Sequence, residues 1–447
     1  MPEKQAGRTG RSVVIVGAGP VGLVAAMYLA PRVRSVTVLE RRPDPRLTGG
    51  PPGRSITVML SARGWRALAG VGLHKRVLMT CMPIRGRCAH LPDGRTHVTP
   101  YSRDRRPIWS VERNRLHGLL LDAAERTPGV EIRFAQRVRE VDLSGPAVLI
   151  DDGPAAVRVG ADLVLGCDGA NSVARTALVS HGVRADVRVL ELAHQEIDVP
   201  GGWLDPSTMH YWPTGDALFA AFPLPNGRFA GSLFMRRQGP APSYAALGGV
   251  EELLEVFTSR FAEPAAAIPD LDRQLSEKRV GTISLVDCDG WVRQDRLALL
   301  GDACHAMAPF MGHGMNCGFE DVRVLTEQLE ATEDWGSALA AYEKMRVEDA
   351  QAISSLSLQH YHTMANPPAE QNAEARERLR QRLFDLFPDR FAPLYERCAF
   401  TEESYATVLR DDQGLTDLVD RLVADGDELL DSRLREYVLA ADAGIGV

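Results

Sequence analysis

A glycine-rich turn near the start of the chain constrains the fold more than any other feature of the sequence. Gly17-Ala18-Gly19-Pro20-Val21-Gly22 follows residues 12–16, a short and continuously apolar run that predicts a buried parallel strand. A predicted helix at residues 23–29 and a second apolar strand at residues 35–39 come next, and this strand leads into Glu40. The pattern is typical of a βαβ unit that binds a dinucleotide.

Each glycine of the turn has its own task in this pattern. Gly17 permits the tight turn, and Gly22 allows the helix to pack closely on the strand. Gly19 lets the backbone approach a pyrophosphate, whose charge the N-terminus of the helix stabilises. The Glu40 carboxylate can accept a hydrogen bond from a ribose hydroxyl. The turn alone does not distinguish FAD from NAD.

Two later strand ends favour FAD. Residues 162–166 form an apolar run that leads into Cys167-Asp168-Gly169, and residues 296–300 lead into Gly301-Asp302. An aspartate at the second position can accept a hydrogen bond from a ribityl hydroxyl. Further on, the sequence predicts a helix whose N-terminus can stabilise negative charge on a reduced flavin. The residues that open this helix are Pro309, Gly312, Gly314, Met315 and Asn316.

The rest of the sequence predicts a second sheet and a helical end. Between residues 183 and 284, segments such as 208–212 and 217–222 are typical of antiparallel strands, and the chain after Asn316 is mostly helical. We predict an α/β Rossmann-type FAD-binding domain in two parts, 1–182 (with a substrate-side segment at about 78–103) and 285–330. An inserted antiparallel β-sheet substrate domain (183–284) and a helical C-terminal region (331–447) complete the prediction.

Composition argues against several other classes of protein. The 447 residues carry a net charge of −8, which disfavours a nucleic-acid partner. The seven cysteines are scattered with no CxxC pair, so no metal site is predicted, and their odd number in a long chain disfavours a disulfide scaffold. A reducing cytoplasm fits these thiols. The polar N-terminus and the short C-terminal tail predict neither a signal peptide nor a membrane anchor.

The flavin motifs, in this order, resemble those of the single-component flavoprotein hydroxylases. Further blocks resemble the kynurenine 3-monooxygenase family over nearly the whole chain, from about Ser12 to Tyr405. These blocks are Arg54-Ser55-Ile56, Leu60-Ser61, Arg63-Gly64, Pro83-Ile84-Arg85-Gly86-Arg87, Pro100-Tyr101, Ser110-Val111-Glu112-Arg113, Leu116, Pro309-Phe310, Gly314-Met315-Asn316 and Gly318-Phe319-Glu320-Asp321. The resemblance implies an enzyme of tryptophan metabolism that uses FAD, NADPH and O2 to hydroxylate the ring of L-kynurenine at carbon 3.

The resemblance also implies which residues form the site. Arg85 and Tyr101 would bind the carboxylate of the amino acid, the guanidinium by two parallel hydrogen bonds. His360, Tyr405 and Met311 would complete the substrate pocket. No side chain is predicted to act as a catalytic acid or base, because the substrate amine already activates the ring. The expected FAD contacts are Gly17, Gly19, Pro20, Gly22, Glu40, Arg41, Arg113, Asp168, Asp302, Gly312, Gly314, Met315 and Asn316.

Two departures from the family pattern leave alternatives open. His360 stands where the family has an asparagine that also serves the carboxylate, and His313 stands where the family has a glutamine. One alternative is therefore a hydroxylase of another 2-aminoaryl or tryptophan-derived acid in a biosynthetic pathway. A flavin halogenase is disfavoured, because its second, tryptophan-rich motif is missing. A flavin-binding regulatory module without turnover is the alternative from another class, and the complete loop from Asp302 to Asn316 argues against it.

Overall fold

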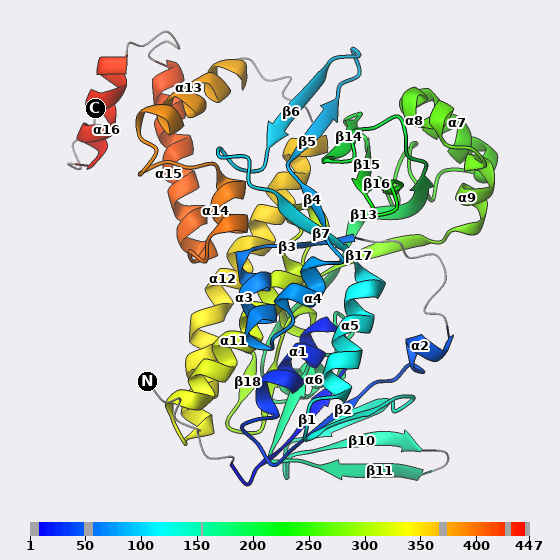
Figure 1. Cartoon of the computed structure of the whole chain (residues 1–447), viewed down its shortest axis with the longest axis vertical. Helices are drawn as coiled ribbons and strands as arrows, with labels where there is room; N and C mark the ends of the chain where they lie inside the picture. Colours follow the sequence, from blue (N-terminus) through cyan, green and yellow to red (C-terminus); the bar gives the residue numbers. More distant parts are fainter. Residues whose placement is uncertain (1–8, 49–56, 153–154, 366–372, 425–430, 443–447) are drawn as a thin grey trace.

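A six-stranded sheet built around the first strand of the chain forms the base of the molecule (Figure 1). The computed structural model describes residues 9–48, 57–152, 155–365, 373–424 and 431–442. The strand order is β18-β19-β12-β1-β2-β8, and every pair is parallel except β18 with β19. The strands are β1 (Ser12–Val16), β2 (Ser35–Leu39), β8 (Val130–Arg133), β12 (Leu163–Gly166), β18 (Val292–Arg293) and β19 (Leu297–Leu299).

Apolar helices cover this sheet and complete the βαβ unit. Helix α1 (Pro20–Leu29) follows the glycine turn, and α5 (Arg113–Glu125) and α11 (Gly314–Ala331) pack against it. Nearly all of α1 is buried, because its sequence is apolar on every side. Helix α6 (Val173–Val179) follows β12, and a small sheet of β9 (Val138–Asp142), β10 (Ala147–Asp152) and β11 (Ala155–Gly160) lies below it in Figure 1.

A seven-stranded sheet forms the second half of the molecule. Its order is β17-β13-β16-β15-β14-β5-β6, with strands β13 (Ala185–Val199), β14 (Thr208–Pro213), β15 (Ala217–Pro223), β16 (Phe229–Arg236), β17 (Val280–Cys288), β5 (Gly86–His90) and β6 (Thr96–Pro100). The predicted antiparallel strands are present. The sheet also takes in β5 and β6 from the first part of the chain, and β5 pairs with β14 in parallel, so the sheet is mixed.

The two faces of this second sheet have different partners. Helices α7 (Val250–Arg260), α8 (Ala262–Ala267) and α9 (Leu271–Glu277) cover one face through a core that includes Trp212, Phe219 and Phe257. The sequence pattern between residues 183 and 284 did not predict these three helices. The other face carries Met209, Leu218 and Phe234 and packs toward the rest of the chain.

Shorter elements and the C-terminal helices join the two halves. Helix α12 (Trp335–Ala365) runs from the six-stranded sheet to the seven-stranded one (Figure 1). A three-stranded sheet lies between the halves, with β3 (Thr57–Leu60), β7 (Ile108–Glu112) and β4 (Met82–Ile84). The remaining helices are α2 (Pro45–Thr48), α3 (Ala62–Gly70), α4 (His74–Leu78), α10 (Asp302–His305), the 3-10 turn η1 (Pro309–Met311), α13 (Ala373–Leu386), α14 (Leu394–Phe400), α15 (Tyr405–Ala424) and α16 (Asp431–Asp442).

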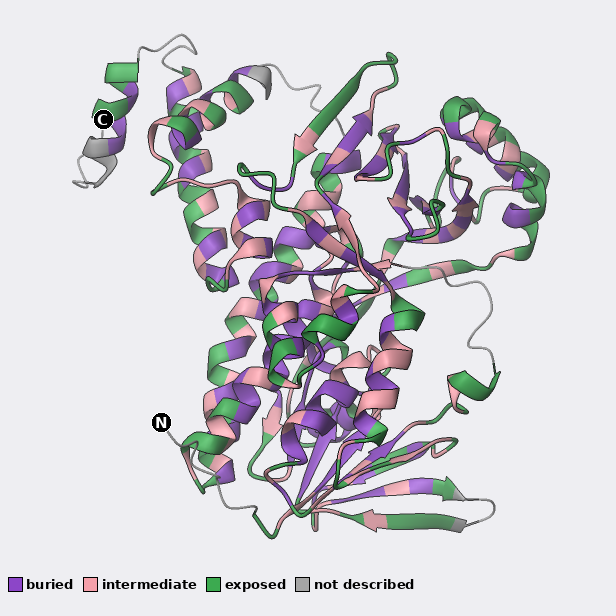
Figure 2. Ribbon diagram, in the orientation of Figure 1, coloured by how far each residue is buried: buried purple, intermediate pink, exposed green. Residues whose placement is uncertain are grey.

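The predicted fold class is confirmed: a Rossmann-type unit, an inserted sheet and a helical C-terminal region are all present. Figure 2 shows the buried positions concentrated in the central strands and on the inner sides of the helices. Among the described residues, no helix combines the length and the apolar character that a membrane crossing requires. The block Arg54-Ser55-Ile56 lies outside the described residues.

Candidate active site

A cavity of about 710 Å³ lies between the two large sheets. Such a volume falls in the upper part of the range of roughly 300–1,000 Å³ that is usual for small-molecule sites. One end is formed by the first glycine turn and the ends of β2 and β12, and the other by β5, β14, α12 and α14. All predicted FAD contacts except Gly22 and Asn316 belong to its described lining.

The glycine turn shapes the first end of the cavity. Gly17 has a φ of +103°, and a Cβ atom there would lie 2.4 Å from the carbonyl oxygen of Cys167. A Cβ on Gly22 would lie 2.1 Å from the carbonyl oxygen of Gly17, so this glycine serves packing and not contact with a ligand. A Cβ on Gly19 would meet nothing within 4 Å, which leaves open space at the N-terminus of α1.

Glu40 is held in place by the backbone around it. Its Oε2 accepts a hydrogen bond from the amide of Ala18 at 3.1 Å, and its Oε1 accepts one from the amide of Arg42 at 2.9 Å. Both oxygens retain acceptor capacity, because a carboxylate has about four lone-pair sites. Glu40 lines the cavity beside Arg41 and Arg42. The carboxylate is therefore fixed at the place where the sequence predicts a ribose.

Asp168 serves both the local fold and the cavity. Its Oδ2 accepts hydrogen bonds from the amides of Val173 at 2.7 Å and Ala174 at 3.3 Å, which satisfies the start of α6. Its Oδ1 is buried and accepts no hydrogen bond from the described residues. Burial raises the pKa of this carboxyl above its ordinary value. A ligand hydroxyl at this wall of the cavity would satisfy the unpaired oxygen.

The loop after β19 forms the middle of the cavity. Asp302 lines the cavity and is exposed, whereas the amide of the preceding Gly301 donates to Oδ2 of Asp321 at 3.0 Å. Asn316 is fully buried behind the loop. Its Oδ1 accepts from the amide of Ser61 at 3.0 Å, and its Nδ2 donates to the carbonyl oxygens of Met59 at 2.8 Å and Gly312 at 3.0 Å. Asn316 therefore joins the loop to β3 and does not reach the cavity.

Arg87, His360, Tyr101 and Tyr395 meet at the far end of the cavity. Arg87 Nη1 lies 2.6 Å from His360 Nε2, and the rings of Tyr101 and Tyr395 stack with centroids 4.8 Å apart. Burial, reinforced by the positive charge of Arg87, lowers the pKa of His360 well below its ordinary value. Burial also raises the pKa of Tyr101 to about 12. This end therefore combines one cation with neutral groups that can form hydrogen bonds.

Of the two arginines in the predicted substrate block, Arg87 lines the cavity and Arg85 does not belong to its described lining. Arg85 precedes β5, is exposed, and donates from Nη1 to the carbonyl oxygen of Arg105 at 3.3 Å. Arg87, two residues further in the same sequence block, lies on β5 and lines the cavity. The block Pro83 to Arg87 contains both residues, and the sequence did not show which of them lies on the strand that faces the cavity.

Tyr405, the predicted substrate-side tyrosine of the C-terminal region, does not belong to the described lining of the cavity. Tyr405 is fully buried behind the cavity, where its hydroxyl pairs with His313 Nδ1 at 2.9 Å and its ring lies 3.7 Å from the Arg63 guanidinium. Tyr395 of α14 lines the cavity instead, and the sequence analysis did not single it out. Tyr101, His360 and Met311, which were also predicted to bind substrate, line the cavity.

These features fit a flavin dinucleotide. The open space at Gly19 meets a helix N-terminus, which stabilises a pyrophosphate. Glu40 and the unpaired oxygen of Asp168 offer acceptors to hydroxyl groups, and Arg41 and Arg113 add positive charge to the same lining. Gly312 and Gly314 leave the loop before α11 without side chains where a planar ring would approach.

Comparison with known proteins agrees with this geometry. A family model described as "FAD binding domain" matches residues 11–357. The chain is 39% identical over 408 residues to the kynurenine 3-monooxygenase of Salinispora arenicola (strain CNS-205), covering 89% of each chain. It is 35% identical over 410 residues to the kynurenine 3-monooxygenase of Xanthomonas campestris pv. campestris (strain 8004), again covering 89% of each.

Solved structures share the fold at lower identity. The tetrameric form of 2-methyl-3-hydroxypyridine-5-carboxylic acid oxygenase superposes with a TM-score of 0.67 at 20% identity, covering 80% of this chain and 94% of that one. pqsL, a probable FAD-dependent monooxygenase from Pseudomonas aeruginosa, gives 0.64 at 22% identity, covering 80% and 97%. This chain belongs to the kynurenine 3-monooxygenase family of NAD(P)H-dependent flavoprotein monooxygenases, and FAD is its cofactor.

Proposed function

We propose that this enzyme hydroxylates the aromatic ring of L-kynurenine at carbon 3, with NADPH and O2 as co-substrates. The observation that carries the proposal is the position of Arg87 at the end of the cavity remote from the glycine turn, where a guanidinium can bind the carboxylate of an amino acid. The family relationship supports the same substrate.

Bound FAD supplies the redox chemistry, in which NADPH provides the electrons and O2 the oxygen atom. The described residues position the substrate and keep water away from it. Met209, Leu218, Phe234 and Met311 give this part of the cavity an apolar lining, which excludes water from the reaction. No side chain has to remove a proton from the substrate before attack, because the lone pair of the aromatic amine already activates the ring.

Two ring carbons of kynurenine are electronically competent, so the pose must select between them. In our proposal Arg87 holds the carboxylate, and the hydroxyl of Tyr101, which stays protonated, donates a further hydrogen bond. His360 is neutral, and its Nε2 lies against Arg87 Nη1. Because His360 occupies one donor of the guanidinium, the others remain for the substrate.

The family relationship favours L-kynurenine over other substrates, and the alternative rests only on the contact between Arg87 and His360. The family has an asparagine where this chain has His360. The imidazole ring changes the space and the hydrogen bonds available to the amino-acid end of the substrate. The alternative substrate is another 2-aminoaryl or tryptophan-derived acid that carries a carboxylate. Both candidates require the same flavin chemistry and the same cation.

A substrate screen tests both candidates. Purified enzyme loaded with FAD is mixed with NADPH and a panel of aromatic acids, and both NADPH oxidation and the hydroxylated product are measured. We expect L-kynurenine to accelerate NADPH oxidation and to be converted to the 3-hydroxy product. Preferential hydroxylation of another 2-aminoaryl acid would select the second candidate. Release of hydrogen peroxide with every compound and no hydroxylated product would contradict both.

We further propose a cytoplasmic location. All seven cysteines are free thiols, and six of them are buried. A reducing compartment keeps such thiols unpaired.

A further inference from the structure

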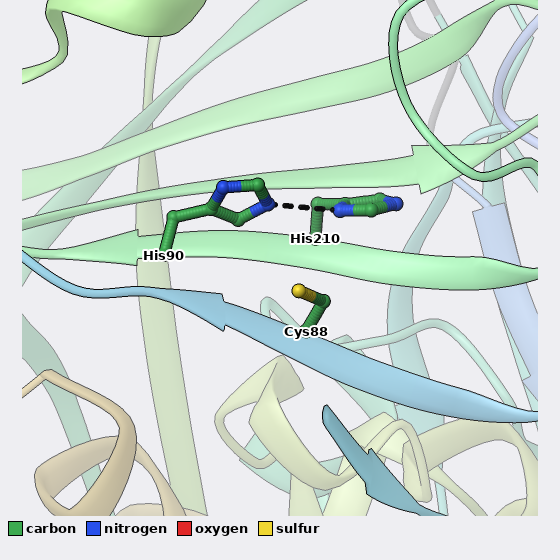
Figure 3. A group of neighbouring side chains, drawn as sticks. All are labelled: Cys88, His90 and His210. Carbon is green, nitrogen blue, oxygen red and sulfur yellow. Dashed lines mark hydrogen bonds between the residues drawn. The ribbon is translucent and has the colours of Figure 1, made fainter. Parts of the chain in front are cut away.

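A cysteine and two histidines meet on the face of the second sheet that points away from the cavity (Figure 3). Cys88 and His90 belong to β5, and His210 belongs to β14. The two strands pair in parallel with His210 directly opposite Cys88. Because side chains alternate along a strand, Cys88 and His90 share one face, while Arg87 points to the cavity.

The donor atoms of these three side chains converge. Cys88 Sγ and one ring nitrogen of each histidine all lie within 4.8 Å of one another. His90 Nε2 and His210 Nδ1 are 2.9 Å apart. Cys88 and His210 are buried and His90 is half-buried, so the group lies under the helical cover of the sheet and not on an open surface.

The surroundings fix the tautomer of each histidine. His210 Nε2 lies 3.0 Å from the carbonyl oxygen of Asp205, which can only accept, so this nitrogen carries a proton and Nδ1 does not. His90 Nδ1 lies 3.0 Å from Oε2 of Glu263, a carboxylate that also accepts from Trp212 Nε1 at 2.9 Å. His90 Nδ1 therefore donates to Glu263, which leaves Nε2 bare in the neutral ring.

Two bare nitrogen lone pairs consequently face each other across 2.9 Å. Two acceptors at this separation repel unless a cation or a proton lies between them. A proton would satisfy the two nitrogens alone. The approach of Cys88 Sγ as a third donor favours a metal ion, because the thiol makes only a weak contact of 3.9 Å with the carbonyl oxygen of Ala89.

The geometry points to a divalent transition-metal site: we propose that Cys88, His90 and His210 bind one Zn²⁺ ion. Cysteine thiolate and histidine imidazole are both zinc ligands, and a water molecule or a carboxylate would complete four-coordination. Glu263 and the Asp205 carbonyl then act as the partners that orient metal-bound histidines. Tetrahedral bonds of about 2.0 Å place two nitrogens about 3.3 Å apart, so small side-chain rotations close the site.

A second group, Cys304, His305 and Asp321, does not support the same inference. It is fully buried, and Arg346 Nε already donates to Oδ1 of Asp321 at 3.0 Å. His305 Nε2 lies 2.5 Å from Oδ2 of Asp321. This carboxylate therefore already has two cationic partners.

A bound ion would have a structural role near the cavity. Arg87 and Met209 line the cavity and are paired across β5 and β14, and each directly precedes a proposed ligand, Cys88 or His210. The ion would join the two strands from behind this pair. We infer that zinc fixes the strand register that presents Arg87 to the substrate. The binding test below needs no turnover, so it stands apart from the test of the proposed function.

The test measures zinc on the FAD-loaded enzyme. Protein dialysed against a chelator is mixed with excess ZnCl2, freed of unbound metal, and analysed for zinc by mass spectrometry and for its ligands by X-ray absorption at the zinc edge. We expect one zinc per chain, bound by one sulfur and two imidazole nitrogens. Absence of stoichiometric zinc in the wild-type enzyme, or a zinc shell without sulfur, would overturn the proposal.

Matched variants locate the site. Cys88→Ala and His210→Gln should lose stoichiometric zinc, and Glu263→Gln should weaken binding by about 10- to 100-fold. Cys81→Ala and His97→Gln serve as controls, because Cys81 precedes β4 and His97 is exposed on β6. Both controls should keep one zinc per chain. Retention of zinc by both Cys88→Ala and His210→Gln would refute the assignment even where the wild-type enzyme binds the metal.

Discussion

The guanidinium of Arg87 and the imidazole of His360 meet at 2.6 Å, although they come from β5 and α12 and are 273 positions apart in the sequence. Arg87 is the cation of the far cavity end, and the low pKa of His360 keeps that ring neutral beside it. In the proposed function, the carboxylate of the substrate binds beside this pair. The first two predictions separate the contributions of its two members.

Arg87→Ala should raise KM for L-kynurenine strongly while FAD content stays normal. Removing the cation leaves the substrate carboxylate buried without a partner, a loss of about 2 to 5 kcal/mol by analogy with broken charge pairs at interfaces. Arg87→Lys should restore only part of the affinity, because an ammonium lacks the two-pronged geometry. Arg85→Ala is the matched control, since Arg85 is exposed on the neighbouring segment. Equal effects of both alanine variants in steady-state kinetics would remove Arg87 from the role of anchor.

His360→Asn should change the ranking of substrates and leave flavin reduction intact. The pKa of His360 is lowered, so the ring becomes charged only at acid pH, and the wild-type enzyme should show no ionisation of His360 between about pH 6 and 8. The measurement is kcat/KM for L-kynurenine and other 2-aminoaryl acids across that range. His362→Asn, on the exposed part of the same helix, is the control. An unchanged ranking would mean that His360 only fills space.

Gly19→Ala should reduce the FAD content of the purified enzyme. A Cβ at Gly19 meets no protein atom within 4 Å, and its φ of −69° suits any residue, so the backbone itself does not oppose the change. The methyl group would instead occupy space where a pyrophosphate approaches. Gly118→Ala is matched, because a Cβ there also meets nothing within 4 Å. The ratio of flavin to protein absorbance measures the FAD content. A full complement of FAD in Gly19→Ala would show that the pyrophosphate does not occupy the space beside Gly19.

Asp321→Asn should destabilise the fold by up to about 3–5 kcal/mol, because it leaves the buried His305 cation without its carboxylate, whereas Arg346 keeps Glu320 and Asp349 as partners. Asp321 contacts His305 at 2.5 Å and Arg346 at 3.0 Å, and all three side chains are buried. Asp334→Asn, at an exposed helix start, is the control. Chemical unfolding measures the difference, and a loss no larger than that of the control would show that this network contributes little.

The same network predicts how stability depends on pH. The pKa of Asp321 is lowered from 3.8, so its contribution is present above that value and is lost as the pH falls through the folded-state pKa. The pKa of His305 is raised well above 6.5, so its contribution is full below 6.5 and is lost as the pH rises through the folded-state pKa. The joint contribution is therefore full between about pH 4 and 6.5. The unfolding free energies of wild type and Asp321→Asn should converge below this window. Above it, their difference should fall to what the contact between Asp321 and Arg346 contributes.

The sequence predicted those parts of the site that depend on local backbone. The turn from Gly17 to Gly22, the strand end at Glu40 and the loop at Asp302 each occupy a fixed position beside a strand or helix of the Rossmann unit. Arg85 and Arg87 show the limit of this reasoning. They lie two residues apart in one block, and only the boundary between β4 and β5 decides which of them faces the cavity.

Contacts between distant segments could not be predicted. Tyr395 stacks on Tyr101 from a helix nearly 300 positions away, and no short motif marks it. His90 and His210 are 120 positions apart, and the pairing of β5 with β14 brings them together. The Cys88 group has no CxxC spacing for this reason. Cross-strand neighbours follow from sheet register, which a single sequence does not reveal for strands so far apart.

The parallel pairing of β5 and β14 limits which insertions and deletions this chain can tolerate. Arg87 and Cys88 are adjacent in the chain and serve opposite faces of one sheet. Insertion or deletion of a single residue just before Gly86 would exchange those faces if the strand kept its place. The arginine would then point toward α8 and the thiol into the cavity. Related chains that conserve both faces should therefore tolerate substitutions along β5 far more readily than changes in its length.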